Sequence, residues 1–132
     1  MSKYLGIDYG DVRIGLAITN EDKNFVFPRG YLDTKNVFSQ LADLIKQESI
    51  EKIIVGMPYS LKSKETDQTK KVRKFIEEMK ARFSLEIVEE DERFSTQAAE
   101  KMLFPIKVKK IKKKIDQSSA VLILEDYLAK HA

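Results

Sequence analysis

The chain contains no cysteine, and its single histidine, His131, is the penultimate residue. Without cysteine it has no disulfide framework, no thiolate zinc site and no cysteine nucleophile. We assign no general-base role to His131, because residues so close to a chain end tend to fray. Any enzymatic chemistry therefore falls to other residue types.

The sequence also lacks a long apolar run. No stretch approaches the ~20 residues that a membrane-spanning helix needs. The first apolar stretch is broken by Gly6 and Asp8, which does not fit a signal peptide. We therefore expect a cytoplasmic protein with no membrane partner. With 132 residues and a hydrophobic fraction of 42%, the chain is expected to form one domain, residues 1–132.

Charge is plentiful but unevenly distributed. Charged residues make up 34% of the chain, yet the net charge is only +3. The segment 107–114 has six lysines in eight residues, and acidic residues cluster at 89–92. A basic run together with a carboxylate cluster fits an enzyme that binds a polyanion and acts on it with a cation. A solvated loop or helix face explains the lysine run equally well.

Three short strands are expected at the start of the chain, at 3–9, 13–20 and 24–32. In the first, Leu5 and Ile7 alternate with Gly6 and Asp8, the pattern of a strand. Short polar turns separate the three segments, which favours antiparallel pairing. The third strand is expected to end near an irregularity at Pro28.

After residue 33 the pattern changes to alternating helices and strands. The apolar run at 53–55 is typical of a strand buried on both faces, as in a parallel sheet. The remaining expected elements are helices at 34–49, around 72–83, at 95–104 and at 115–130, and a fifth strand at 85–89. The sequence therefore predicts an α/β fold with a mixed five-stranded sheet, first antiparallel and then parallel, flanked by helices.

Acidic residues follow the expected strands at places where they could meet. Asp8 ends the first strand, where burial is costly unless the carboxylate is hydrogen-bonded, paired or metal-bound. Asp91 and Glu92 follow the fifth strand, and Asp116 begins the last helix. If the first, fourth and fifth strands are parallel neighbours, these residues share the edge of the sheet where sites in open α/β folds gather.

Carboxylates without histidine or cysteine suit Mg²⁺ or Mn²⁺. A pair of such ions can activate water and stabilise the leaving oxygen in phosphodiester hydrolysis. Arg13 and Arg93 suit phosphate recognition beside such a site. The residues expected to hold a nucleic acid backbone are Lys107, Lys109, Lys110, Lys112 and Lys113.

Each of these residues also has a simpler interpretation. Asp8 could be a turn aspartate bonded to its own backbone. Asp91, Glu92 and Arg93 could form a surface ion pair, and Asp116 could be a plain helix cap. The functional interpretation is favoured because the topology would gather all of them at one edge.

Four sequence motifs carry a family resemblance. They are GIDYGDVRIGLA at 6–17, IIVGMP at 53–58, DERFST at 91–96 and IDQSSAVLILEDYL at 115–128. With these motifs in order and at the right spacing, the chain resembles the YqgF/RuvX family of Holliday-junction-resolvase-like nucleases. That family belongs to the ribonuclease-H-like superfamily, and the resemblance extends over almost the whole chain.

The resemblance implies a divalent-metal-dependent, cytoplasmic endonuclease of ribonuclease-H-like fold. It places the catalytic and metal-binding carboxylates at Asp8, Glu92 and Asp116, with Asp91 as the alternative to Glu92. The expected role is maturation of the 5′ end of precursor 16S ribosomal RNA, and the alternative is resolution of four-way DNA junctions. The protein would be a monomer or a homodimer, because symmetric cutting of a junction requires two copies.

Some residues depart from the family pattern. No glycine follows soon after Pro58, and Ser118 and Ser119 stand where small apolar residues are common. Two other classes of protein would also explain parts of this sequence. Actin-like ATPases and sugar kinases share an Asp-x-Gly turn, but they need two domains, and no Walker A sequence is present. The second class is a non-catalytic nucleic-acid-binding module, in which the lysines bind nucleic acid and the carboxylates are vestigial.

Overall fold

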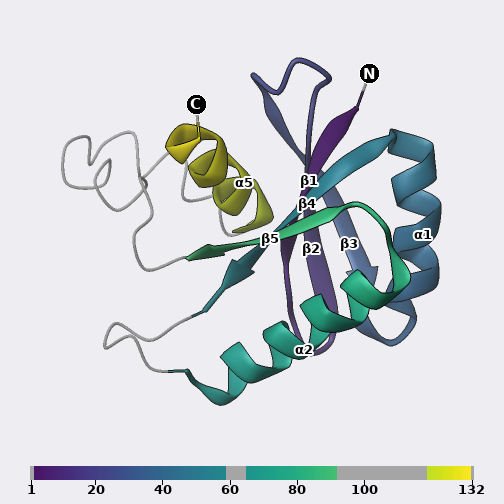
Figure 1. Cartoon of the computed structure of the whole chain (residues 1–132), viewed down its shortest axis with the longest axis vertical. Coiled ribbons are helices and arrows are strands. Elements are labelled where there is room, and N and C mark those ends of the chain that lie inside the picture. The colour runs from purple at the N-terminus through teal and green to yellow at the C-terminus, as the bar shows by residue number, and fades with distance from the viewer. Residues whose placement is uncertain (1, 59–64, 92–118, 132) are drawn as a thin grey trace.

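A computed structural model describes residues 2–58, 65–91 and 119–131 (Figure 1). Its five-stranded sheet has the order β3-β2-β1-β4-β5. The strands are β1 (Lys3–Asp8), β2 (Arg13–Thr19), β3 (Val26–Asp33), β4 (Ile50–Met57) and β5 (Glu86–Asp91). The first three strands pair antiparallel, whereas β1, β4 and β5 run parallel. The expected α/β fold with a mixed five-stranded sheet, first antiparallel and then parallel, is confirmed.

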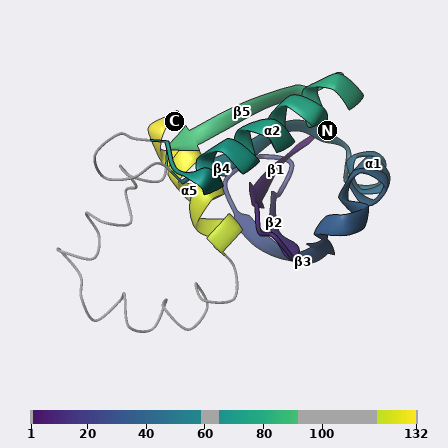
Figure 2. The ribbon, with the colours of Figure 1, turned by 90° about the horizontal axis from the view of Figure 1, so that it is seen from below.

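Helices cover both faces of the sheet, as Figures 1 and 2 show. A short 3-10 helix, η1 (Thr34–Asn36), leads into α1 (Val37–Glu48), and α2 (Asp67–Arg82) packs beside α1 on the same face. The helix α5 (Ser119–Lys130) covers the opposite face. The helix expected at 95–104 lies outside the described residues.

The alternation of side chains along the strands divides the interior into two cores. Leu5 and Ile7 of β1 are fully buried in the core formed with α1 and α2. Ala17 of β2 and Ile54 of β4 are fully buried in the core beneath α5. Because β4 contributes to both cores, it has the uninterrupted apolar sequence of a strand that is covered on both faces.

The irregularity expected near Pro28 is present in β3, but it does not end the strand, which continues to Asp33. Leu16 pairs with Gly30 and the next residue of β2, Ala17, pairs with Pro28, so Arg29 is the extra residue of a bulge. Gly30 has a φ of +85°, a left-handed conformation that glycine adopts without steric cost.

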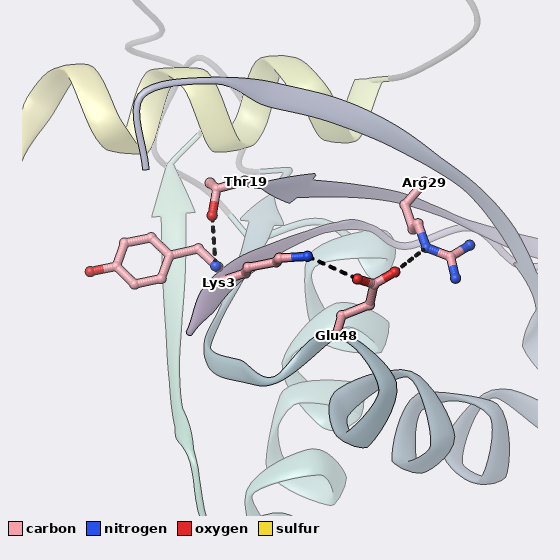
Figure 3. Close-up of polar contacts among 5 residues, drawn as sticks. Lys3, Thr19, Arg29 and Glu48 are labelled. Carbon is pink, nitrogen blue, oxygen red and sulfur yellow. Dashed lines mark hydrogen bonds and ion pairs between the residues drawn. The ribbon is translucent and has the colours of Figure 1, made fainter. Parts of the chain in front are cut away.

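Polar contacts hold the start of β1 in place (Figure 3). The Glu48 carboxylate at the end of α1 accepts hydrogen bonds from Lys3 at 3.1 Å and from Arg29 at 3.0 Å. These bonds, first that from Lys3 and then that from Arg29, lower the pKa of Glu48. The buried Thr19 hydroxyl oxygen accepts the Tyr4 N–H at 2.9 Å. The first strand is thus fixed at the edge opposite to the one where Asp8 lies.

Candidate active site

Asp8 is the last residue of β1, and its side chain lies on the face of the sheet that α5 covers. The alternation of β1 determines this face, because Leu5 and Ile7 belong to the α1–α2 core, whereas Gly6 contacts α5. Asp8 is half-buried. As predicted, it lies at the edge where β1, β4 and β5 end.

Gly6 allows α5 to approach β1 closely. A Cβ atom at this position would lie 3.0 Å from the Ala120 carbonyl oxygen and 3.0 Å from Leu124 Cβ. Both distances are shorter than ordinary van der Waals contact, so any side chain here would push against the helix. The close approach brings the first residue of α5, Ser119, to Asp8, and the two side chains form a hydrogen bond.

Two opposing effects act on the pKa of Asp8. Burial raises the pKa of the carboxyl group, and the hydrogen bond from Ser119 lowers it by less, so the pKa remains above its ordinary value. A negative charge at the N-terminus of a helix is also favoured by the peptide dipoles. An ionised carboxylate that burial disfavours is stabilised by a nearby cation. The chemistry of this position therefore fits a ligand of a divalent metal ion.

A second carboxylate, that of Glu90, lies in the same row of the sheet. Ile7 is beside Val55 in the register of β1 and β4, which places Gly56 beside Asp8. Gly56 in turn pairs with Glu90 of β5. Glu90 is only 5% exposed, and its Oε2 lies 3.0 Å from Nζ of Lys130 in α5.

Glu90 is absent from the predicted site residues, because the expected strand ended at residue 89 and the predicted acidic residues were those beyond it. The signal was in the strand itself. Counting in twos along 86–91 places Glu90 on the same face as Val88, which packs in the core under α5. Its pairing with Lys130 indicates that Glu90 fixes the end of α5 to the sheet.

Asp91 shares the edge of the sheet with Asp8 but not its face. It pairs in register with Met57, which is fully buried in the core formed with α1 and α2. Neighbouring residues on adjacent strands point to the same side. Asp91 is therefore on the side of α1 and α2, and Asp8 is on the side of α5.

The other predicted site residues lie outside the part of the chain that the structure describes. They are Glu92, Arg93, Lys107, Lys109, Lys110, Lys112, Lys113 and Asp116. Within 2–58, 65–91 and 119–131, no three histidine, cysteine, aspartate or glutamate residues form a group that could hold a metal ion. The expected metal site thus has Asp8 as its one member among the described residues.

The turn after Asp8 has a fixed shape. A Cβ on Gly10 would lie 2.3 Å from the Arg13 carbonyl oxygen, so only glycine fits. The Thr34 hydroxyl donates a hydrogen bond to the Gly10 carbonyl oxygen at 2.8 Å, and the Thr34 N–H donates to that of Val12 at 3.0 Å. Arg13 follows this turn at the edge where Asp8 lies, and its side chain is exposed.

Comparison with known proteins decides the family. The family model named RuvX, Holliday junction resolvase, matches residues 2–130. The chain belongs to the RuvX family. A relative from Sulfurihydrogenibium sp. named "Putative pre-16S rRNA nuclease" is 40% identical, with 97% of this chain and 90% of that protein covered. Relatives with the same name are 38% identical in Maridesulfovibrio salexigens (97% and 98% covered) and 37% identical in Thermus thermophilus (94% and 95% covered).

A crystal structure of fowlpox virus resolvase in complex with Holliday junction DNA is also similar. It is 13% identical, has a TM-score of 0.49 and covers 96% of this chain and 92% of the resolvase chain. From its family and its relatives, this RuvX protein is a nuclease, and the predicted enzyme class, a hydrolase acting on nucleic acid, is confirmed. No helix in the described segments is long and apolar enough to cross a membrane.

Proposed function

We propose that this RuvX protein is a cytoplasmic, metal-dependent endonuclease that cleaves precursor 16S ribosomal RNA during maturation of its 5′ end. The observation that carries the proposal is the position of Asp8, half-buried at the carboxyl end of β1 and bonded to the first residue of α5. Such strand ends are where active sites form in open α/β sheets. The names of the three relatives support RNA as the substrate.

The metal-binding set in this proposal is Asp8, Glu92 and Asp116. Asp91 lies on the opposite face of the sheet from Asp8, which favours its sequence neighbour Glu92. Asp116 precedes Ser119 by three positions in the sequence, and Ser119 bonds to Asp8. These two facts support the choice of partners for Asp8.

Mg²⁺ or Mn²⁺ bound by these carboxylates would supply activation of a water molecule and stabilisation of the leaving oxygen. The residues of the chain do the rest. Ser119 orients the Asp8 carboxylate by its hydrogen bond. Arg13 provides a positive charge for a substrate phosphate at the same edge. The lysines of 107–114 would hold the backbone farther along.

Resolution of four-way DNA junctions is the second candidate, because the matching family model carries that name. Contacts to phosphates serve both substrates and carry no sequence information. Purified protein should therefore be given precursor 16S RNA and a four-way DNA junction side by side. Cleavage of the RNA with the junction left intact is the expected result, and the reverse preference would replace RNA maturation by junction resolution. The cleaving species is expected to be a monomer on RNA, whereas a dimer would cut the junction.

The catalytic role of Asp8 is tested by Asp8→Asn, with Asp11→Asn as the matched control. Both variants lose one negative charge in the same turn, but Asp11 is exposed. Asp8→Asn is expected to reduce Mg²⁺- or Mn²⁺-dependent cleavage at least ~100-fold, with RNA affinity and the unfolding midpoint nearly unchanged. Asp11→Asn should cleave like the wild type. Cleavage by Asp8→Asn at the wild-type rate would refute the mechanism.

A further inference from the structure

An aromatic side chain, Tyr31 of β3, lies in the same row of the sheet as Asp8. The register pairs Tyr31 with Gly15 of β2, and Gly15 with Asp8 of β1. Residues paired in this way point to the same face. Tyr31 is 48% exposed, so a large part of its surface is accessible to a ligand.

Gly15 leaves open the space between Tyr31 and Asp8. A Cβ at Gly15 would lie 3.5 Å from Tyr31 Cε1 and 3.8 Å from Asp8 Cβ. The tyrosine ring therefore leans across the glycine towards Asp8, with no side chain in between. Two strand spacings separate the backbones of Tyr31 and Asp8 by about 10 Å, a distance that a short length of single strand covers.

Arg13 adds a positive charge to the ring. Its guanidinium carbon lies 4.7 Å from the centroid of the Tyr31 ring, a cation–π contact that restrains both side chains. An aromatic ring stacked with an arginine is the combination on which proteins hold unpaired bases, while the arginine also attracts phosphates. Phe27, exposed by a similar 49% on the same strand, pairs with Ile18 of the α1–α2 core instead.

We propose that Tyr31, supported by Arg13, is a stacking platform for an unpaired base next to the phosphate that is cleaved at Asp8. The inference rests on the proposed function, because it takes Asp8 as the site of cleavage. Stacking on an aromatic ring accepts any base. The platform therefore selects single-stranded nucleotides over paired ones and does not read their sequence.

The test compares Tyr31→Leu and Tyr31→Phe with the control Phe27→Leu. Affinity is measured by fluorescence anisotropy in EDTA, which prevents cleavage, for a short single-stranded RNA and for a fully paired RNA duplex. Loss of the ring in Tyr31→Leu should weaken binding of the single strand about 5- to 100-fold and leave duplex binding unchanged. Tyr31→Phe and Phe27→Leu should stay within about twofold of the wild type, since each leaves the ring at position 31 in place.

Equal effects of Tyr31→Leu and Phe27→Leu, or an equal loss on single strand and duplex, would overturn the platform. If Tyr31→Leu does not fold, the wild type is photo-crosslinked to single-stranded RNA containing 5-bromouridine. Mass spectrometry should then find the adduct on Tyr31, and adducts only elsewhere would overturn the proposal. Because these measurements need no cleavage, failure of the platform is distinct from cleavage by Asp8→Asn, which would refute the proposed function.

Discussion

The contact between Gly6 and α5 predicts that this position is sensitive to a single methyl group. In Gly6→Ala the new Cβ would lie 3.0 Å from both the Ala120 carbonyl oxygen and Leu124 Cβ. Carbon atoms attract each other best at about 3.5–4.0 Å, so α5 has to move by several tenths of an ångström. Gly15→Ala is the matched control, because its Cβ would find its nearest neighbour at 3.5 Å, an ordinary contact.

The magnitude follows from two opposing effects. Overpacking by one methyl group costs about 1–3 kcal/mol, and replacing glycine by alanine returns about 0.4–1 kcal/mol by restricting the unfolded chain. Gly6→Ala should therefore lower the free energy of unfolding by roughly 1–2 kcal/mol. Gly15→Ala, which avoids the overlap, should be unchanged or up to about 1 kcal/mol more stable.

Urea unfolding followed by circular dichroism measures both variants. With a denaturant slope of about 2 kcal/mol/M, Gly6→Ala should unfold at a urea concentration lower by roughly 0.5–1 M. An unfolding midpoint for Gly6→Ala equal to that of Gly15→Ala would show that α5 does not press against β1 as described. The cleavage rate of Gly6→Ala should also fall, since displacement of α5 moves Ser119 away from Asp8.

Two further predictions concern the turn and the opposite edge of the sheet. Gly10→Ala should destabilise the protein more than Gly6→Ala and reduce cleavage, because its Cβ would lie 2.3 Å from a backbone oxygen that no rotamer change can move; thermal unfolding and a cleavage assay check this. Glu48→Gln should cost about 0.5–1 kcal/mol at pH 7. Because the pKa of Glu48 is lowered in the folded state, its contribution is present above the ordinary value of 4.5 and is lost as the pH falls through the folded-state pKa. Urea unfolding of both proteins should thus converge in acid, and a constant difference would contradict this.

Local patterns in the sequence were sufficient to predict the sheet. The alternation at 3–9 and the unbroken apolar run at 53–55 were sufficient to identify β1 and β4 as strands. The limits of the elements depended on tertiary contacts. β4 begins at Ile50 because Lys52, polar in sequence, is accommodated by a hydrogen bond from its Nζ to the Tyr127 hydroxyl at 2.9 Å. The sequence pattern did not show that α2 begins at Asp67. The helix is capped by Thr66 and Thr69, and Thr69 occupies the position where a capping box usually has glutamate or glutamine.

The candidate site was predictable only as far as the strand ends. The position of Asp8 at the edge shared by β1, β4 and β5 follows from strand order. Which side chains meet there depends on how α5 docks. Val121 and Ile123 are both apolar, yet Val121 is only partly buried whereas Ile123 is 4% exposed, so the composition of the helix does not reveal its buried face. The bond from Ser119 to Asp8 depends on the same docking, so no motif could reveal it.

The joining of β1 to α5 also determines when the site can form. The carboxylate comes from the eighth residue of the chain, and the hydroxyl that bonds it comes from residue 119. Contacts between residues so distant in sequence are slow to form, and a chain folds from its N-terminal part first as it is synthesised. A nascent chain can therefore pair its early strands while Asp8 still faces water. The bond between Ser119 and Asp8 can form only after the ribosome has released α5, so this carboxylate gains its partner later than the first strands pair.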